Sequence, residues 1–268
     1  RLREKTLNDS PEYQAKKRFY DKILTVYGRK PVLEALQEND VEVHRLHLAD
    51  SNKSGGIVSE ILALAKTKGA EVVYHDRKAL SRISKNSKQD QGVAVDLVCQ
   101  GYINYQDFLQ QPPRKDFELL ALDGITNPQN LGMIIRSACA GGIDGILLPN
   151  KGSAKIDPLV IKASAGTLFK ANILRCDNLA SALSEFQTAG ARICGLSSHA
   201  KLGLNQLSGS GAKIFVLGNE TEGVSPEVSK LSDDLVSIPM NNGVESLNVA
   251  VTGSLIAFRS VLSGLPSQ

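Results

Sequence analysis

Apolar and polar positions form two different patterns along this chain, one in each of two regions. Between residues 23 and 100, segments with helical spacing alternate with short apolar runs, as in the helix expected over 29–36 and the strand expected over 43–48. From residue 117 onward, short apolar strands alternate regularly with amphipathic helices. Such alternation favours an α/β domain with a mainly parallel sheet and helices on both faces.

The pattern predicts most elements by their bounds. In the first region we expect further helices over 54–68 and 77–85, and strands over 71–74 and 91–98. In the second region the expected strands are 117–122, 145–148, 171–175, 191–196, 214–217 and 235–238, and the expected helices are 132–140, 158–169, 179–189, 226–231 and 247–262.

Changes in composition divide the chain into four parts. Residues 1–22 are polar and form an expected extension, and residues 23–100 form a small α/β domain. The stretch 101–116 holds Pro112-Pro113 beside polar residues, which is typical of an interdomain linker. Residues 117–268 form the larger domain.

Charge and composition narrow the function classes. Hydrophobic residues make up 42% of the chain, yet no apolar run approaches the roughly 20 residues of a membrane helix. The four cysteines show no metal-ligand spacing, so we expect no metal, no membrane and a cytoplasmic location. Residues 1–100 contain 18 Lys/Arg and 14 Asp/Glu, a balance of +4, whereas residues 101–268 contain 13 and 14. The positive half is the natural place for a polyanion.

Three polar stretches each follow an expected strand. The first runs from Asn127 to Gly132 and is followed by Arg136, the second covers 216–223, and the third covers 238–250. Ligands of parallel sheets bind beyond the carboxyl ends of the strands, so these stretches are expected to form one site. In the third stretch Ser246 occupies an expected N-cap position before the helix.

In this order and spacing, the three stretches resemble the motifs of the SpoU/TrmH family of RNA ribose 2'-O-methyltransferases. The resemblance covers roughly residues 117–264. It implies a SPOUT-type fold with a trefoil knot, S-adenosyl-L-methionine as cofactor and a site at a homodimer interface. Residues 23–100 look like the small substrate-binding domain of many such enzymes. Many relatives carry His-Gln-Gly where this chain has Asp90-Gln91-Gly92.

The resemblance also implies roles for individual residues. The catalytic candidates are Arg136, Asn130, Glu220, Ser246 and Asn248, and the cofactor-binding candidates are Gly218, Ile238, Leu247, Leu196 and Ser197.

Physical reasoning refines some of these roles. Because a guanidinium stays protonated, Arg136 is expected to grip a phosphate or stabilise the developing alkoxide rather than act as a base. Glu220 is expected to pair with Arg136 or to anchor the pocket, and Asn130 to orient the target nucleotide or Arg136. Gly218 lacks a side chain that would obstruct the cofactor.

Basic residues of the small domain are candidates for RNA contact. Four of them recur at helix-like and loop spacing, where phosphate binding would use them as point charges and forks. The alternative is a solvated helix face. The candidates are Arg29, Arg77, Lys78, Arg82 and Lys85.

The sequence therefore predicts an S-adenosylmethionine-dependent RNA ribose 2'-O-methyltransferase that acts on a guanosine of 23S rRNA as a homodimer. Two alternatives remain open at this point. One is a tRNA ribose 2'-O-methyltransferase, and the other is a non-catalytic RNA-binding or ribosome-assembly factor with the same fold.

Overall fold

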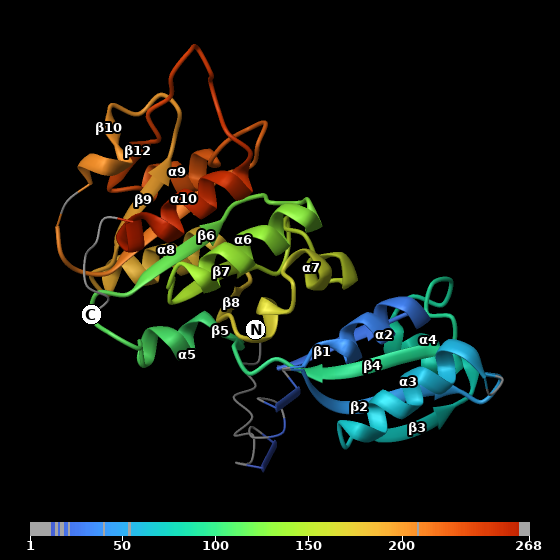
Figure 1. The fold of residues 1–268 in the computed structure, drawn as a ribbon. Coiled ribbons are helices and arrows are strands. Elements are labelled where there is room, and N and C mark those ends of the chain that lie inside the picture. The colour runs from blue at the N-terminus through green and yellow to red at the C-terminus, as the bar shows by residue number, and fades with distance from the viewer. Residues whose placement is uncertain are drawn as a thin grey trace, which may run out of the picture.

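The computed structural model describes residues 12–13, 16, 19–20, 22–39, 41–52, 55–207 and 209–262. The chain forms a small and a large lobe, which Figure 1 shows side by side. The expected polar extension over 1–22 lies outside the described residues except for the few positions named above.

The small lobe is built on a four-stranded sheet, counted over the described residues. Its elements are β1 (Ile23–Tyr27), α2 (Arg29–Gln37), β2 (Glu42–Ala49), α3 (Gly56–Thr67), β3 (Glu71–His75), α4 (Arg77–Ser84) and β4 (Val93–Val98). The strand order is β1-β4-β2-β3, in which only β2 and β3 run parallel. The sequence pattern predicted the helices and three of these strands but not β1.

The two faces of the small sheet carry different helices. Leu46 of β2 belongs to the cluster that contains Leu36 of α2 and Ile61 of α3. Ala49, at a position of opposite parity on β2, instead packs with Leu80 of α4. Since alternate strand residues face opposite sides, α4 and its basic residues lie on the face away from α2 and α3.

The large lobe follows the alternating pattern that the sequence predicts. Its elements are β5 (Tyr102–Asn104), α5 (Tyr105–Gln110), β6 (Glu118–Leu122), α6 (Pro128–Ala140), β7 (Gly145–Pro149), α7 (Pro158–Ala163), η1 (Thr167–Phe169), β8 (Ile173–Cys176), α8 (Leu179–Thr188), β9 (Arg192–Leu196), β10 (Leu202–Gly203), η2 (Leu204–Gln206), β11 (Lys213–Leu217), α9 (Pro226–Leu231), β12 (Asp234–Ser237) and α10 (Val249–Leu262). In the described residues the strands form one sheet of order β10-β12-β9-β11-β6-β7-β8-β5, and every pairing is parallel.

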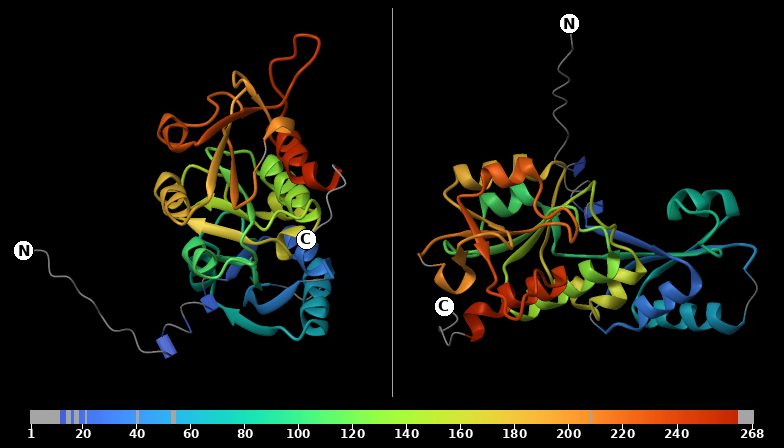
Figure 2. Two further views of the ribbon diagram at one scale, coloured as in Figure 1. Left: turned by 90° about the vertical axis from the view of Figure 1, so that its left-hand side faces the viewer. Right: turned by 90° about the horizontal axis from the view of Figure 1, so that it is seen from above.

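Helices cover both faces of the large sheet, as expected for α/β architecture (Figures 1 and 2). Leu120 and Leu122 of β6 share a cluster with residues of α6, α7 and α10. Leu119 and Ala121, which alternate with them, pack with residues of α5, α8 and α9. All four side chains are fully buried, so β6 lies at the centre of the domain. The trefoil knot implied by the resemblance stays a prediction.

The stretch expected to be a linker, 101–116, contains β5 and α5 instead. β5 pairs with β8, and Tyr105 and Phe108 are buried against Phe186 of α8. Close packing also requires glycine at position 101, because a Cβ there would overlap the backbone of Ala171. These residues therefore extend the large sheet rather than form a free connector.

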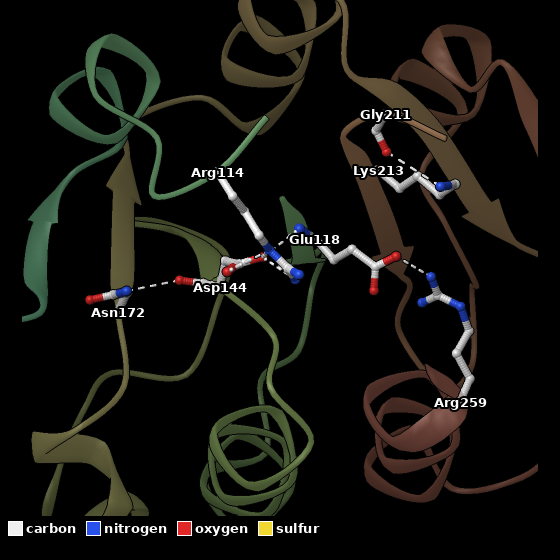
Figure 3. Close-up of polar contacts among 7 residues, drawn as sticks. All are labelled: Arg114, Glu118, Asp144, Asn172, Gly211, Lys213 and Arg259. Carbon is white, nitrogen blue, oxygen red and sulfur yellow. Dashed lines mark hydrogen bonds and ion pairs between the residues drawn. The ribbon is translucent and has the colours of Figure 1, made fainter. Parts of the chain in front are cut away.

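Ion pairs occupy the amino-terminal edge of the large sheet (Figure 3). Asp144 accepts hydrogen bonds from the Arg114 guanidinium at 3.0 and 2.8 Å and from the Glu118 amide at 2.8 Å. The carboxylate of Glu118 pairs in turn with Arg259 of α10, whose guanidinium lies 4.4 Å from the centre of the Phe215 ring. The charged side chains at this edge therefore pair with one another, and the Glu118–Arg259 pair joins α10 to β6.

Candidate active site at the carboxyl edge of the large sheet

Polar loops leave the opposite, carboxyl-terminal edge of the large sheet. The loops that carry the three motifs follow β6, β11 and β12, and β9 lies between β11 and β12 in the sheet. Neighbouring strands are about 4.8 Å apart, so the loops begin close together. This arrangement makes contacts between motifs that are far apart in the sequence.

Asn130 links all three motifs through its side chain. It lies in the first turn of α6 and is only 5% exposed. Its Nδ2 donates a hydrogen bond to the Glu220 carboxylate of the second motif. Its Oδ1 accepts a hydrogen bond of 3.2 Å from Nδ2 of Asn248 in the third motif. The buried amide therefore fixes the relative positions of the three loops.

Asn248, and not Ser246, caps the final helix. Oδ1 of Asn248 accepts a hydrogen bond of 2.9 Å from the Ala250 amide, and α10 begins at Val249. Ser246 is exposed two residues earlier. The N-cap prediction for Ser246 is wrong because the loop is longer than the sequence suggested and Asn caps a helix at least as well as Ser.

The second motif forms a loop closed by its own backbone. Asn219 and Gly223 exchange two backbone hydrogen bonds of 3.0 and 2.8 Å. A Cβ on Gly218 would overlap the backbone of Gly223 and Val224. Glycine is therefore required at position 218 by the loop itself, which is a different reason from the cofactor approach that the sequence analysis proposed.

Two residues that the sequence did not single out, Asn219 and Asp123, join the second motif and the residues after it to the loop that leads from β6 into the first motif. The Asn219 Nδ2 donates a hydrogen bond of 2.9 Å to the Gly124 carbonyl. The Asp123 carboxylate accepts one of 2.7 Å from the Ser225 amide. The available signal was position, because Asp123 directly follows a buried strand and Asn219 directly follows Gly218.

Arg136 is exposed on α6, and no hydrogen bond or ion pair joins it to another described residue. Glu220 pairs with Asn130 rather than with Arg136, so of the two roles expected for Glu220 the structure shows the anchoring contact. The guanidinium of Arg136 remains available to a ligand.

Four of the cofactor candidates, Gly218, Leu196, Ser197 and Ile238, lie at the ends of neighbouring strands, and Leu247 lies just before α10. Leu196 pairs with Val236 of β12, and the Ser197 amide donates a hydrogen bond of 2.9 Å to the Val236 carbonyl. Ile238 and Leu247 are half-buried at the two ends of a loop whose residues 241–246 are exposed. Figure 1 shows this loop projecting from the large lobe between β12 and α10. Cofactor binding by these residues stays a prediction.

Four of the basic candidates in the small lobe are exposed, and one is engaged. Arg77, Lys78 and Arg82 lie on α4, and Lys85 follows as its C-cap. Arg29 differs, because its guanidinium donates to the Gln91 carbonyl at 3.3 Å and to Oδ1 of Asn52 at 3.0 Å. In this structure Arg29 joins two loops of the small lobe.

Asp90, which stands where the resemblance led us to expect a His, has a structural role. It is only 2% exposed, and its carboxylate accepts hydrogen bonds of 2.9 Å from the Ser84 hydroxyl and from the Gly92 amide. Asp90 therefore holds the turn between α4 and β4.

The all-parallel sheet, its polar carboxyl edge and the attached small lobe define an α/β protein with an accessory domain. A model of the SpoU rRNA Methylase family matches residues 118–258, and a model described as RNA 2'-O ribose methyltransferase substrate binding matches residues 25–98. The chain belongs to the SpoU rRNA Methylase family, whose members are S-adenosylmethionine-dependent RNA methyltransferases.

Sequence relatives support this assignment. The chain is 34% identical over 233 residues to an uncharacterized tRNA/rRNA methyltransferase of Mycolicibacterium vanbaalenii, which covers 86% of this chain and 74% of the relative. It is 33% identical over 240 residues to a protein of the same description from Mycobacterium tuberculosis H37Rv, which covers 88% of this chain and 73% of the relative.

Solved structures confirm the fold class. The SpoU methyltransferase AviRb from Streptomyces viridochromogenes, crystallised with AdoMet, matches with a TM-score of 0.62 and 25% identity over 92% of this chain and 94% of AviRb. An AdoMet-bound rRNA methyltransferase from Sinorhizobium meliloti matches with a TM-score of 0.62 and 23% identity over 94% and 92%, which supports the fold alone.

Two features are absent from the described residues. None of their helices has the length and apolarity that crossing a bilayer requires. No three His, Cys, Asp or Glu side chains among them gather closely enough to hold a metal ion.

Proposed function

We propose that this protein transfers a methyl group from S-adenosylmethionine to a ribose 2'-hydroxyl of RNA, and that its target is a guanosine of 23S rRNA. The observation that carries the proposal is the contact of Asn130 with both Glu220 and Asn248, because it assembles the three motif loops into one site. The match of the small lobe to a substrate-binding model of RNA 2'-O ribose methyltransferases supports the choice of the ribose.

The residues at the carboxyl edge fit a nucleoside-containing cofactor. Main-chain groups of Gly218, Ile238 and Leu247 would hold it, and Leu196 and Ser197 would border it. The half-buried Ile238 and Leu247 combine apolar surface for a base with backbone amides for its edge. When bound, S-adenosylmethionine supplies an electrophilic methyl carbon.

Arg136 would act on the RNA side of the reaction. Its permanent positive charge suits a phosphate next to the target ribose and the negative charge that develops on the 2'-oxygen. Asn130 would keep the polar loops in register around the reacting atoms, while Glu220 and Asn248 hold Asn130 through its two amide atoms.

A second copy of the chain would complete the site. α6 and α10 pack together and expose apolar side chains, namely Met133 (41%), Val251 (47%), Leu255 (39%), Val261 (57%) and Leu262 (76%). Arg136 lies on the same helix as Met133, one turn further on. Apolar surface of this kind supports a homodimer that brings Arg136 near its partner's loops.

The decisive experiment maps ribose methylation across rRNA and tRNA in a strain that lacks the gene. We expect one guanosine of 23S rRNA to lose its 2'-O-methyl group and to regain it when the gene is restored. Loss of a tRNA ribose methyl would instead establish the tRNA alternative. If calorimetry shows no S-adenosylmethionine binding and no methyl group is lost, the protein is a non-catalytic assembly factor.

A further inference from the structure

A cleft of about 940 Å³ lies between the small lobe and the β5–β8 end of the large sheet. Lys22 and Gln100 of the small lobe form one wall, α5 forms another, and residues after β7 and β8 form the third. Figure 1 shows β5 and β8 at the side of the large sheet nearest the small lobe. The residues proposed above for methyl transfer lie outside the lining of this cleft.

The cleft opens on the same sheet edge as the methyl-transfer site. Because all strands of the large sheet are parallel, the residues after β5, β7 and β8 share the carboxyl edge with those after β6. β8 is two strands from β6, a separation of roughly 10 Å at about 4.8 Å per strand. One RNA segment can therefore reach both places.

An arginine stacked on a tyrosine lies in the cleft. The Arg175 guanidinium lies 4.7 Å from the centre of the Tyr102 ring. Its Nε donates a hydrogen bond of 3.1 Å to Oδ1 of Asn150, whose Nδ2 donates one of 2.7 Å to Asp177. Tyr102 thus contacts one face of the guanidinium, and Asn150 binds one of its edges. Arg175 is also one of the residues that line the cleft. Arginine planes of this kind stack on unpaired bases.

The charge of the lining favours a base over a phosphate. Two cations, Lys22 and Arg175, are balanced by two carboxylates, Asp107 and Asp177. Most other polar lining residues are amides, which offer a donor and an acceptor on one side chain. Amides of this kind line three sides of the cleft and include Gln100, Asn104, Gln106, Gln110, Asn150 and Asn178.

Backbone hydrogen bonds hold the segments that border the cleft. The Ile173 amide donates a hydrogen bond of 2.6 Å to the Gly101 carbonyl, and the Cys99 amide donates one of 2.8 Å to the Lys22 carbonyl. Leu24 of the small lobe packs near Ile173 of the large lobe at an apolar contact beside the cleft. The walls are thus joined by backbone and apolar contacts.

We propose that an unpaired base of the RNA substrate, near the nucleotide to be methylated, docks in this cleft by stacking on Arg175. The inference rests on the proposed function in that it assigns this base to the same RNA. It extends the proposal by naming a second recognition site, which reads a base beside the target rather than the target itself.

The first test compares Arg175→Ala with Arg175→Lys in filter binding to in vitro transcribed 23S rRNA. Loss of the stacking plane should weaken binding about tenfold in both variants, because lysine keeps the charge but not the plane. Their salt dependence and S-adenosylmethionine affinity should match the unaltered protein. Full rescue by lysine would show a simple charge contact and overturn the proposal.

The second test fills the cleft without removing Arg175. Ser181 is exposed in the lining, whereas Ser184 is exposed on the same helix outside it. Ser181→Trp should weaken binding of the same transcript severalfold, and Ser184→Trp should leave it unchanged. Equal binding by both tryptophan variants, together with unchanged binding by Arg175→Ala, would show that the cleft is only a gap between lobes.

These outcomes differ from a failure of the proposed function. If the unaltered protein methylates no ribose of the transcript but the Arg175 and Ser181 variants still lose RNA affinity, the cleft proposal stands and the 2'-O assignment falls. If the unaltered protein methylates the transcript and the variants bind it normally, only the cleft proposal falls. No binding of the transcript by the unaltered protein would overturn both.

Discussion

The two edges of the large sheet are built from different chemistry. At the amino edge, Asp144, Arg114 and the Glu118–Arg259 pair satisfy one another's charges. At the carboxyl edge, uncharged amides predominate, and Arg136 has no partner among the described residues. Pairing and hydrogen-bonding a buried charge offsets the cost of removing it from water, whereas an unpartnered exposed charge stays available to a ligand. This sheet therefore separates an edge of paired charges from an edge whose exposed arginine is unpartnered among the described residues.

The largest expected effect is on catalysis at the carboxyl edge. Arg136→Ala should lower kcat for methyl transfer by about 10²–10³-fold, because it removes a cation from the site where negative charge develops. The affinity for S-adenosylmethionine and the melting temperature should not change. Arg136→Lys keeps a charge without the planar fork, so its kcat should lie between that of the unaltered protein and that of Arg136→Ala. Near-normal turnover of the alanine variant would remove Arg136 from the mechanism.

At the amino edge the effect should fall on stability instead. Asp144→Ala leaves the Arg114 guanidinium and the Glu118 amide without their acceptor, which should lower the free energy of unfolding by about 2 kcal/mol. Urea denaturation measures this value. The matched control is Asp116→Ala, since Asp116 is exposed close to Arg114. A large loss of activity in folded Asp144→Ala protein would contradict the division between the edges.

A smaller effect is expected at Glu220, where two variants distinguish the role of its charge from that of its hydrogen bond with Asn130. Glu220→Ala removes the acceptor for Asn130 and should lower kcat/KM about tenfold, the equivalent of one lost hydrogen bond to a charged group. Glu220→Gln keeps an acceptor oxygen and should retain most activity. If the glutamine variant is as impaired as the alanine variant, the negative charge of Glu220 itself is required.

The smallest effect should come from the basic helix of the small lobe. Neutralising Arg82 and Lys85 together should reduce the slope of log K against log salt by about 2, roughly 0.9 for each lost phosphate contact. Lys66→Ala on α3 is the control, since Lys66 is exposed on a helix of the opposite face. An unchanged slope in the double variant would place the RNA on another surface.

Local patterns in the sequence predicted most of the fold. The alternation of apolar strands and amphipathic helices identified β6 to β9, β11 and β12 within a few residues. β5 and α5 were missed because Pro112-Pro113 and the surrounding glutamines suggested a linker. The better signal was the spacing of Tyr105 and Phe108, which places both rings on one face of a short helix.

The sequence predicted the candidate site less completely. Motif order pointed to Asn130, Glu220 and Asn248 as candidates, but not to the contacts that join them. Glu220 and Asn248 lie 90 and 118 residues from Asn130 in the sequence, so no local pattern links them. The choice between Ser246 and Asn248 as N-cap depended on loop length, which propensity does not determine. The need for Gly218 depended on the path of residues 223–224.

The central claim is that the carboxyl edge methylates a ribose oxygen. The most direct measurement incubates the purified protein with methyl-labelled S-adenosylmethionine and unmodified 23S rRNA, digests the RNA and identifies the labelled nucleoside by mass spectrometry. We expect the label in 2'-O-methylguanosine, and its loss with Arg136→Ala. A label on a base, or labelling that persists undiminished in Arg136→Ala, would contradict the account.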